Sequence, residues 1–167
     1  MIHAVESFWT ELLGARLSVL LCSALPIIEL RGGIPLGAVL GLAWWESFGL
    51  AIVGNMLPVP FILLFVNRVI ARMSRSKFKL FHKIGSWLLR KAEKNRERIE
   101  KYGFGGVCLF VAVPLPVTGA WTGSLVAATV GMRFWRALLS AFLGVLIAAT
   151  LVTMISYGAL AALGFLL

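Results

Sequence analysis

The sequence contains little charge and very little acid. Of its 167 residues only 14% are charged, only seven are Asp or Glu, and 60% are hydrophobic. A soluble chain of this length cannot keep so much apolar surface away from water. The composition therefore predicts an integral membrane protein.

The residues that several kinds of chemistry need are also scarce. The two cysteines, Cys22 and Cys108, both lie in apolar runs, which is typical of packed thiols rather than of a disulfide or a metal site. The sequence has no nucleophile with a matching base, no glycine-rich phosphate loop and no metal-ligand spacing. We therefore expect no enzyme activity, no metal and no cofactor.

Positive charge is concentrated in one segment. Between Arg68 and Lys101 the chain has 12 Lys or Arg and 3 Glu, within a formal net charge of +9. Because apolar stretches flank the segment, the positive-inside rule favours a cytoplasmic loop over a nucleic-acid site. We predict that residues 68–102 form a basic amphipathic segment on the cytoplasmic surface. Its partners would be anionic membrane lipids, and no nucleic acid.

Residues 25–54 are repeated as residues 115–144. At this offset of 90 the two segments share 8 identities over 30 positions without a gap. An internal duplication in a membrane protein is typical of two halves that face each other across the bilayer, with a binding site between them. The identical pairs that carry most weight are prolines, glycines and tryptophans: Pro26 and Pro116, Gly33 and Gly123, Gly41 and Gly131, Trp45 and Trp135, and Gly54 and Gly144.

Each copy starts with apolar segments that are too short to cross a membrane. In the first copy, residues 17–25 and 34–45 flank a polar break, and by helical rise they span roughly 14 and 18 Å, about half of the hydrocarbon core. Such arms favour a re-entrant helical hairpin with its tip near the midplane. The competing interpretation threads each broken segment across the membrane, which gives four full spans. Prolines mark the two predicted hairpin tips: Pro26, Pro35, Pro114 and Pro116.

Residues 47–67 and 137–160 are each long enough to cross the membrane. Glu46 of the first copy is replaced by Arg136 in the second, so the flanking charge places the two copies in opposite orientations. We predict an all-α integral membrane fold, an inverted repeat of two units. Each unit is a re-entrant hairpin plus one transmembrane helix, with amphipathic helices on the surface. The single membrane domain 1–167 divides into an interfacial amphipathic helix (1–15), the first repeat (16–67), the basic segment (68–102) and the second repeat (103–160).

Glu29 and Arg31 lie in the break of the first hairpin. A carboxylate and a guanidinium at membrane depth are costly unless they are paired or hydrated, so they usually mark a functional site. Burial disfavours the charged form of a carboxyl group, which makes Glu29 a candidate for proton uptake and release. Arg31 is a candidate anion ligand, beside the backbone N–H groups of a helix start at Gly32 and Gly33. The alternative is a structural ion pair that holds the hairpin tip.

The tip of the second hairpin contains no charge. Thr118 and Thr122 offer hydroxyl groups, and Gly119 allows close approach of the backbone. Either these residues bind substrate opposite the first tip, or they form a capped turn in which Thr122 caps the returning helix. Asn55, in the first long span, either lines the same cavity or is a satisfied polar residue of the core.

Two motifs carry a resemblance to a known family. The segments ELRGGIPLG (residues 29–37) and PLPVTGAWTG (residues 114–123) together resemble the putative small multidrug export proteins, over about residues 15–150. That family is similar in turn to the DedA/VTT superfamily, which has two re-entrant hairpins in inverted repeat and includes lipid-phosphate translocases and lipid scramblases. The resemblance implies that Glu29 and Arg31 are the functional pair. DedA proteins usually carry an arginine in the second hairpin, where this tip is neutral.

These observations favour a proton-coupled translocase of an anionic lipid or a lipid-phosphate carrier, in the plasma membrane of a prokaryote. Arg31 would bind the headgroup, and Glu29 would couple protonation to release. Two alternatives stay open: an exporter of small molecules such as cationic drugs, and a membrane scaffold that transports nothing. Small-residue faces such as Gly33, Gly37 and Gly41 suggest a homodimer.

Overall fold

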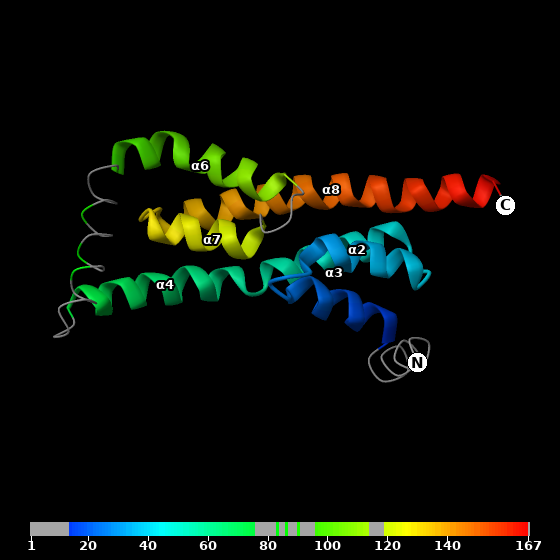
Figure 1. Cartoon of the computed structure of the whole chain (residues 1–167), viewed down its shortest axis with the longest axis horizontal. Helices are drawn as coiled ribbons and strands as arrows, with labels where there is room; N and C mark the ends of the chain where they lie inside the picture. Colours follow the sequence, from blue (N-terminus) through cyan, green and yellow to red (C-terminus); the bar gives the residue numbers. More distant parts are fainter. Residues whose placement is uncertain are drawn as a thin grey trace. The chain divides into compact units, whose positions relative to one another are not determined.

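The computed structural model describes residues 14–75, 96–113 and 119–166, and the isolated positions Lys83, Ser86 and Arg90. All regular structure in these ranges is α-helical, which confirms the predicted class for them (Figure 1). In chain order the helices are Gly14–Ala24, α2 (Glu29–Val39), α3 (Trp44–Met56), α4 (Val59–Ser74), α6 (Arg96–Ala112), α7 (Ala120–Thr129) and α8 (Phe134–Leu166).

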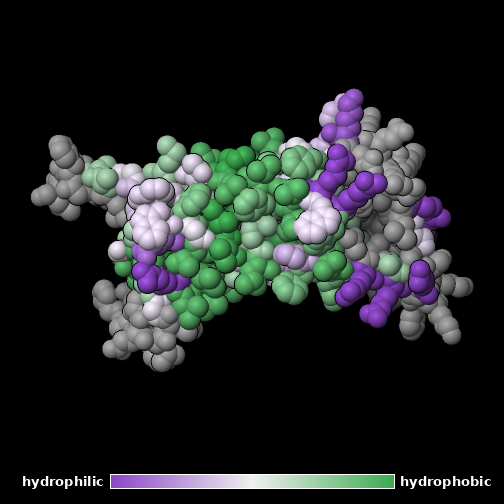
Figure 2. Space-filling model, turned by 180° about the vertical axis from the view of Figure 1, so that it is seen from behind, coloured by the Kyte–Doolittle hydropathy of each residue, from purple (hydrophilic) through white to green (hydrophobic). Residues whose placement is uncertain are grey.

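Two helical stretches are long and apolar enough to cross a membrane. One runs from Trp44 to Val66 through α3 and α4, and the other is Phe134–Ala159 within α8. Hydrophobic side chains dominate the surface over much of the face in Figure 2. An apolar exterior of this kind suits contact with lipid tails. Large side chains that are exposed on the two stretches include Phe61, Phe65, Leu143, Met154 and Ile155.

The described chain divides into two compact units. The first unit comprises the described residues up to Leu57 and those from Val145 onward, and the second unit runs from Pro58 to Gly144. The first unit therefore contains the helix Gly14–Ala24, α2, α3 and the last part of α8. The second unit contains α4, α6, α7 and the first part of α8.

A Schellman motif ends α2 and separates it from α3. The Gly41 N–H donates to the Ala38 carbonyl (3.2 Å), and the Leu42 N–H donates to the Gly37 carbonyl (2.9 Å). Gly41 has φ +75°, the left-handed conformation that this motif needs and that glycine adopts without a Cβ clash. The structure thus has two helices where the sequence predicted a single arm over residues 34–45.

The second copy has the same turn between α7 and α8. Gly131 has φ +77°, and its N–H donates to the Ala128 carbonyl (3.0 Å). The Met132 N–H donates to the Ala127 carbonyl (3.0 Å). All these partners occur at the offset of 90 seen in the sequence. The sequence repeat therefore has a counterpart in local structure.

Gly54 fixes how α3 packs in the first unit. A Cβ on Gly54 would collide with the carbonyl oxygen of Leu20 and with the Ser23 side chain. Only glycine therefore allows α3 to lie this close to the helix Gly14–Ala24. Close packing of this kind is typical of small residues in membrane helices.

Gly144 plays the same part in the second unit. A Cβ there would collide with the carbonyl oxygen of Cys108 and with Val111 on α6. Cys108 thus occupies the place that Leu20 has in the first unit, and Val111 the place of Ser23. Leu20 and Cys108 are 88 positions apart, and so are Ser23 and Val111, whereas Gly54 and Gly144 are 90 positions apart. The chain between these contacts is therefore two residues longer in the second copy.

The first break is shorter than the sequence predicted. Only Leu25–Ile28 separate α2 from the helix before it. Gly32 and Gly33 are helical, because their missing Cβ atoms make room for neighbouring side chains. Pro35 lies inside α2 rather than in the break, whereas Pro26 lies in the break as predicted. The predicted break was too long because every glycine and proline in it was treated as a helix breaker.

The start of the second copy also differs from the prediction. Helix α6 begins at Arg96 and continues to Ala112, so the end of the basic segment and the first apolar arm form one helix. The sequence had placed the start of the repeat at Gly103. Residues 1–13 of the predicted interfacial helix, most of the basic segment, and Pro114 and Pro116 of the second tip lie outside the described residues.

Candidate functional site

Glu29 has the least usual backbone of the described residues. It is the first residue of α2, it is 5% exposed, and its φ is +53° although it is not a glycine. A left-handed conformation costs a residue with a Cβ roughly 1–2 kcal/mol. At the same offset the second copy has Gly119, which carries no such penalty. Strained residues of this kind persist where the surroundings enforce them, and they cluster at functional sites.

Arg31 lies close enough to Glu29 for their charges to interact. Its side chain is half-buried in the first turn of α2, where burial disfavours its positive charge and the carboxylate of Glu29 favours it. When Glu29 is ionised, the pair has no net charge. When Glu29 is protonated, the pair carries the net positive charge of Arg31, which favours a nearby anion. The start of α2 adds N–H groups that favour negative charge.

Gly32 and Gly33 are packing residues in the structure. A Cβ on Gly32 would collide with Ile28, and a Cβ on Gly33 would collide with Ser23 of the preceding helix. Both glycines therefore hold α2 against its own break and against the helix Gly14–Ala24. Their contribution to the candidate site is to position Glu29 and Arg31, since their own surfaces face protein.

Asn55 and Thr153 add two buried polar groups to the first unit. Asn55 is 1% exposed and Thr153 is 8% exposed. Neither the Asn55 amide nor the Thr153 hydroxyl has a hydrogen-bond partner among the residues that the structure describes. The sequence singled out Asn55 but missed Thr153, whose signal was a hydroxyl group one helical turn before Tyr157 in α8.

Glu29 and Asn55 lie at a similar depth in the first unit. Helices α2 and α3 form an antiparallel pair, and Gly37 of α2 packs directly on Ser47 of α3. Eight residues separate Gly37 from Glu29, and eight separate Ser47 from Asn55. By helical rise each is about 12 Å from the Gly37–Ser47 contact along the pair.

The second copy presents a capped helix start instead of charge. The Gly119 N–H donates to the Thr122 Oγ1 (3.0 Å), and the Thr122 hydroxyl lies 3.3 Å from the Gly119 carbonyl oxygen. Thr122 therefore caps α7, which was one of the two roles predicted for it. Thr118 lies outside the described residues. The buried hydroxyls of Ser124 and Ser140 both donate to backbone carbonyls of the second unit.

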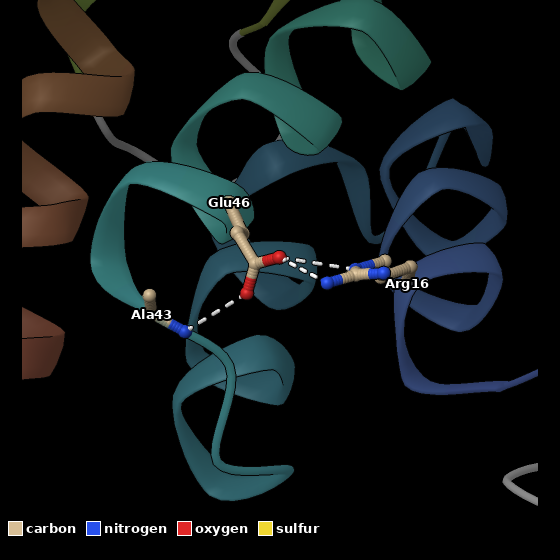
Figure 3. A network of polar contacts seen from close by, with 3 residues as sticks. All are labelled: Arg16, Ala43 and Glu46. Atoms are coloured by element: carbon tan, nitrogen blue, oxygen red, sulfur yellow. Dashed lines mark hydrogen bonds and ion pairs between the residues drawn. The ribbon is translucent and has the colours of Figure 1, made fainter.

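An ion pair closes the other end of the first unit (Figure 3). The Arg16 Nε and guanidinium NH2 donate to Glu46 Oε1 at 3.0 and 2.5 Å, and the Ala43 N–H donates to Glu46 Oε2 at 3.4 Å. Glu46 thus caps α3 and ties it to the helix Gly14–Ala24. From the sequence, Glu46 served only to predict the orientation of the repeat, and no role was predicted for Arg16.

A groove of about 570 Å³ opens beside this ion pair. Apolar side chains form most of its wall, and Arg16 lies at its edge. The residues that line it are Gly14, Ala15, Arg16, Leu17, Leu20, Leu42 and Leu50. It is an apolar surface of the first unit with one charged residue.

Comparison with known protein families bears on this arrangement. Residues 29–151 match the model of the family described as putative small multi-drug export protein. The chain belongs to this family. The match starts at Glu29 and includes α2 and α7, so it covers both copies of the repeat. No curated protein and no solved structure gives a significant match.

Family membership and the two apolar helices together identify a membrane protein of a family described as exporters. The prediction of a small multidrug export protein is thereby confirmed. The further relation to the DedA/VTT superfamily stays a prediction.

Proposed function

We propose that this family member is a proton-coupled transporter whose substrate is an amphiphile with an anionic headgroup, such as an anionic lipid or a lipid-phosphate carrier. The observation that carries the proposal is Glu29, which is buried and strained and interacts with Arg31. A transporter can use such a charged pair to bind a proton and an anion, and it needs no nucleophile to do so. Intramembrane ionisable residues are functional by default.

The charge of the pair gives the direction of coupling. Protonation of Glu29 leaves the Glu29–Arg31 pair with a net positive charge, which attracts the anionic headgroup. Deprotonation of Glu29 restores the internal pair and weakens the hold on the anion. The proton and the anion therefore bind together and leave together, so they cross the membrane in the same direction.

The small size of the protein suits an amphiphile. A chain of 167 residues has little interior in which to enclose a whole solute. Only the polar headgroup needs the site, because the acyl tail can stay in the bilayer against the exposed apolar side chains of α4 and α8. Anionic lipids are therefore both the membrane partners and the substrate class of this proposal.

The proposal includes re-entrant hairpins in inverted orientation. The helix Gly14–Ala24 and α2 each contain 11 residues, roughly 16 Å of helix, and neither is long enough to cross the hydrocarbon core alone. The basic segment would face the cytoplasm of a prokaryote. Tags placed at Gly14 and in the turn at Gly41 would separate this topology from four full spans, since the two tags lie on the same side of the membrane in a re-entrant hairpin and on opposite sides if the broken segment crosses.

The name of the family favours a second candidate, the export of small drug molecules. A cationic drug would have to displace Arg31 from Glu29 before it could pair with the carboxylate. This competition makes a cation the weaker candidate. Drug efflux that needs Glu29 and improves in Arg31→Ala would identify it.

The test is transport by the purified chain in liposomes. Transbilayer movement of a fluorescent phosphatidylglycerol and of a polyprenyl phosphate is measured with and without a pH gradient. We expect Glu29→Gln, which cannot release the anion by deprotonation, and Arg31→Ala, which loses a charge-assisted contact to the headgroup, each to slow movement at least about tenfold. Glu46→Gln, a carboxylate at the other end of the same unit, is the matched control and retains movement.

Near wild-type movement in both site variants would contradict the proposed site. Movement of a cationic drug but of neither lipid would favour the second candidate. No movement of any probe would leave the scaffold interpretation, in which Glu29 and Arg31 are structural.

A further inference from the structure

Asn55 and Thr153 have no protein partner in a part of the first unit that is otherwise closely packed. The Nδ2 and Oδ1 atoms of Asn55 and the Oγ1 atom of Thr153 are buried, and none of them has a hydrogen bond to any described residue. Buried polar groups in proteins are almost always hydrogen-bonded, to protein or to ordered water. Together these three atoms therefore point to a ligand that both donates and accepts hydrogen bonds.

Hydrogen bonds between α3 and α8 show where this ligand lies. The Tyr157 hydroxyl donates to the Leu42 carbonyl at 2.8 Å, so the Ser47 hydroxyl donates to the Tyr157 oxygen at 2.7 Å. Figure 1 shows the last part of α8 running opposite to α3. From the contact between Ser47 and Tyr157, Thr153 lies one turn along α8 toward its N-terminus. Asn55 lies two turns along α3 toward its C-terminus, which is the same direction because the helices are antiparallel. We call this line of contact the α3–α8 seam.

The atoms present identify the ligand as water. A metal cation could be bound by the Oδ1 and Oγ1 atoms, but it would repel the Nδ2 hydrogens of Asn55. Water can form hydrogen bonds with all three atoms. An anion would be repelled by Oδ1. We propose that Asn55 and Thr153 hold internal water in the α3–α8 seam, which Ser47 and Tyr157 close at one end.

This water gives Glu29 a way to exchange protons with solvent. Asn55 lies at the depth of Glu29, and Leu42, which accepts the Tyr157 hydrogen bond, also lines the open groove beside Arg16. The seam thus leads from a surface groove to the depth of the site. The presence of water is independent of the proposed function, whereas its use for proton exchange rests on it.

The residues at the offset of 90 are matched controls. Val145 corresponds to Asn55 and Leu63 corresponds to Thr153, and both are buried and apolar. Single cysteines at these four positions are introduced into the full-length Cys22→Ala, Cys108→Ala protein. In lipid nanodiscs, where both membrane faces are open, each variant is treated with silver ions. The thiols that remain are then counted with a fluorescent maleimide in denaturant.

We expect silver to modify Asn55→Cys and Thr153→Cys at least about tenfold faster than Val145→Cys and Leu63→Cys, because a hydrated thiol ionises more readily than one in apolar surroundings. Adding Tyr157→Phe, which removes the hydrogen bond to Leu42, should accelerate the first two further. Equal and slow rates at all four positions would show that the seam is dry and would overturn the inference.

A transport assay of Asn55→Leu and Thr153→Val completes the test. We expect both to fold and to lose the stimulation of lipid movement by a pH gradient. Unchanged stimulation would overturn the proton route. Fast silver modification together with normal transport in Glu29→Gln would keep the water and overturn the proposed function, so the two failures are distinguishable.

Discussion

The two units share a scaffold but differ in what they bury. Their turns have the same hydrogen bonds, around Gly41 and Gly131, and their long helices pack through equivalent glycines. At five places the first unit buries a polar residue whose equivalent is apolar or glycine. The five are Ser23, Glu29, Ser47, Asn55 and Thr153, and their equivalents are Val111, Gly119, Ala137, Val145 and Leu63. The second unit instead buries Ser124 and Ser140, whose hydroxyls donate to backbone carbonyls of their own unit.

This difference separates the residues that build the fold from those that could carry function. Residues that the two copies share serve turns and close packing, which both units need. Polar residues that occur in one copy only are not needed to form the helix pair, because the other copy forms it without them. Burying these polar groups and straining the backbone of Glu29 costs free energy of folding. A function of the first unit is the best explanation for this cost.

The largest expected effect comes from giving the first copy the residue of the second. We expect Glu29→Gly to abolish proton-coupled transport in liposomes. The same change should alter the free energy of unfolding by no more than about 1 kcal/mol, because relief of the left-handed conformation offsets the lost interaction with Arg31. The midpoint of thermal unfolding in detergent measures the second effect. A large loss of stability would show that Glu29 is a structural residue.

Substitution at the shared packing glycines should harm both units equally. We expect Gly54→Val and Gly144→Val each to destabilise the protein by roughly 1–3 kcal/mol, because each added side chain meets a backbone carbonyl of the neighbouring helix. Unfolding by denaturant, with helicity as the signal, gives the comparison. A loss confined to one of the two variants would contradict the equivalence of the packing.

The smallest expected effect is at the ion pair in Figure 3. Arg16 is 72% exposed, so solvent screens the pair, and Arg16→Met should cost less than about 1 kcal/mol. Transport at moderate salt should stay unchanged. If Arg16→Met instead lowers transport while thermal stability is preserved, the groove beside it belongs to the substrate path.

The sequence predicted the helical class, the repeat and the two long apolar stretches, because glycine spacing and hydropathy are local properties of the chain. It misplaced the first break, since Gly32 and Gly33 are read as helix breakers until the packing of Ser23 and Ile28 against them is known. It also missed Thr153 and Tyr157. Their importance depends on α8 lying against α3, a contact between residues about a hundred positions apart in the sequence.

The central claim, that Glu29 carries a proton together with an anionic substrate, is tested most directly by substrate-driven proton entry. Vesicles that contain the protein and an internal pH dye receive an anionic amphiphile on the outside, with no imposed gradient. The account predicts that wild type acidifies the interior and that Glu29→Gln does not. Equal acidification by Glu29→Gln would contradict it, because the proton would then cross without this carboxylate.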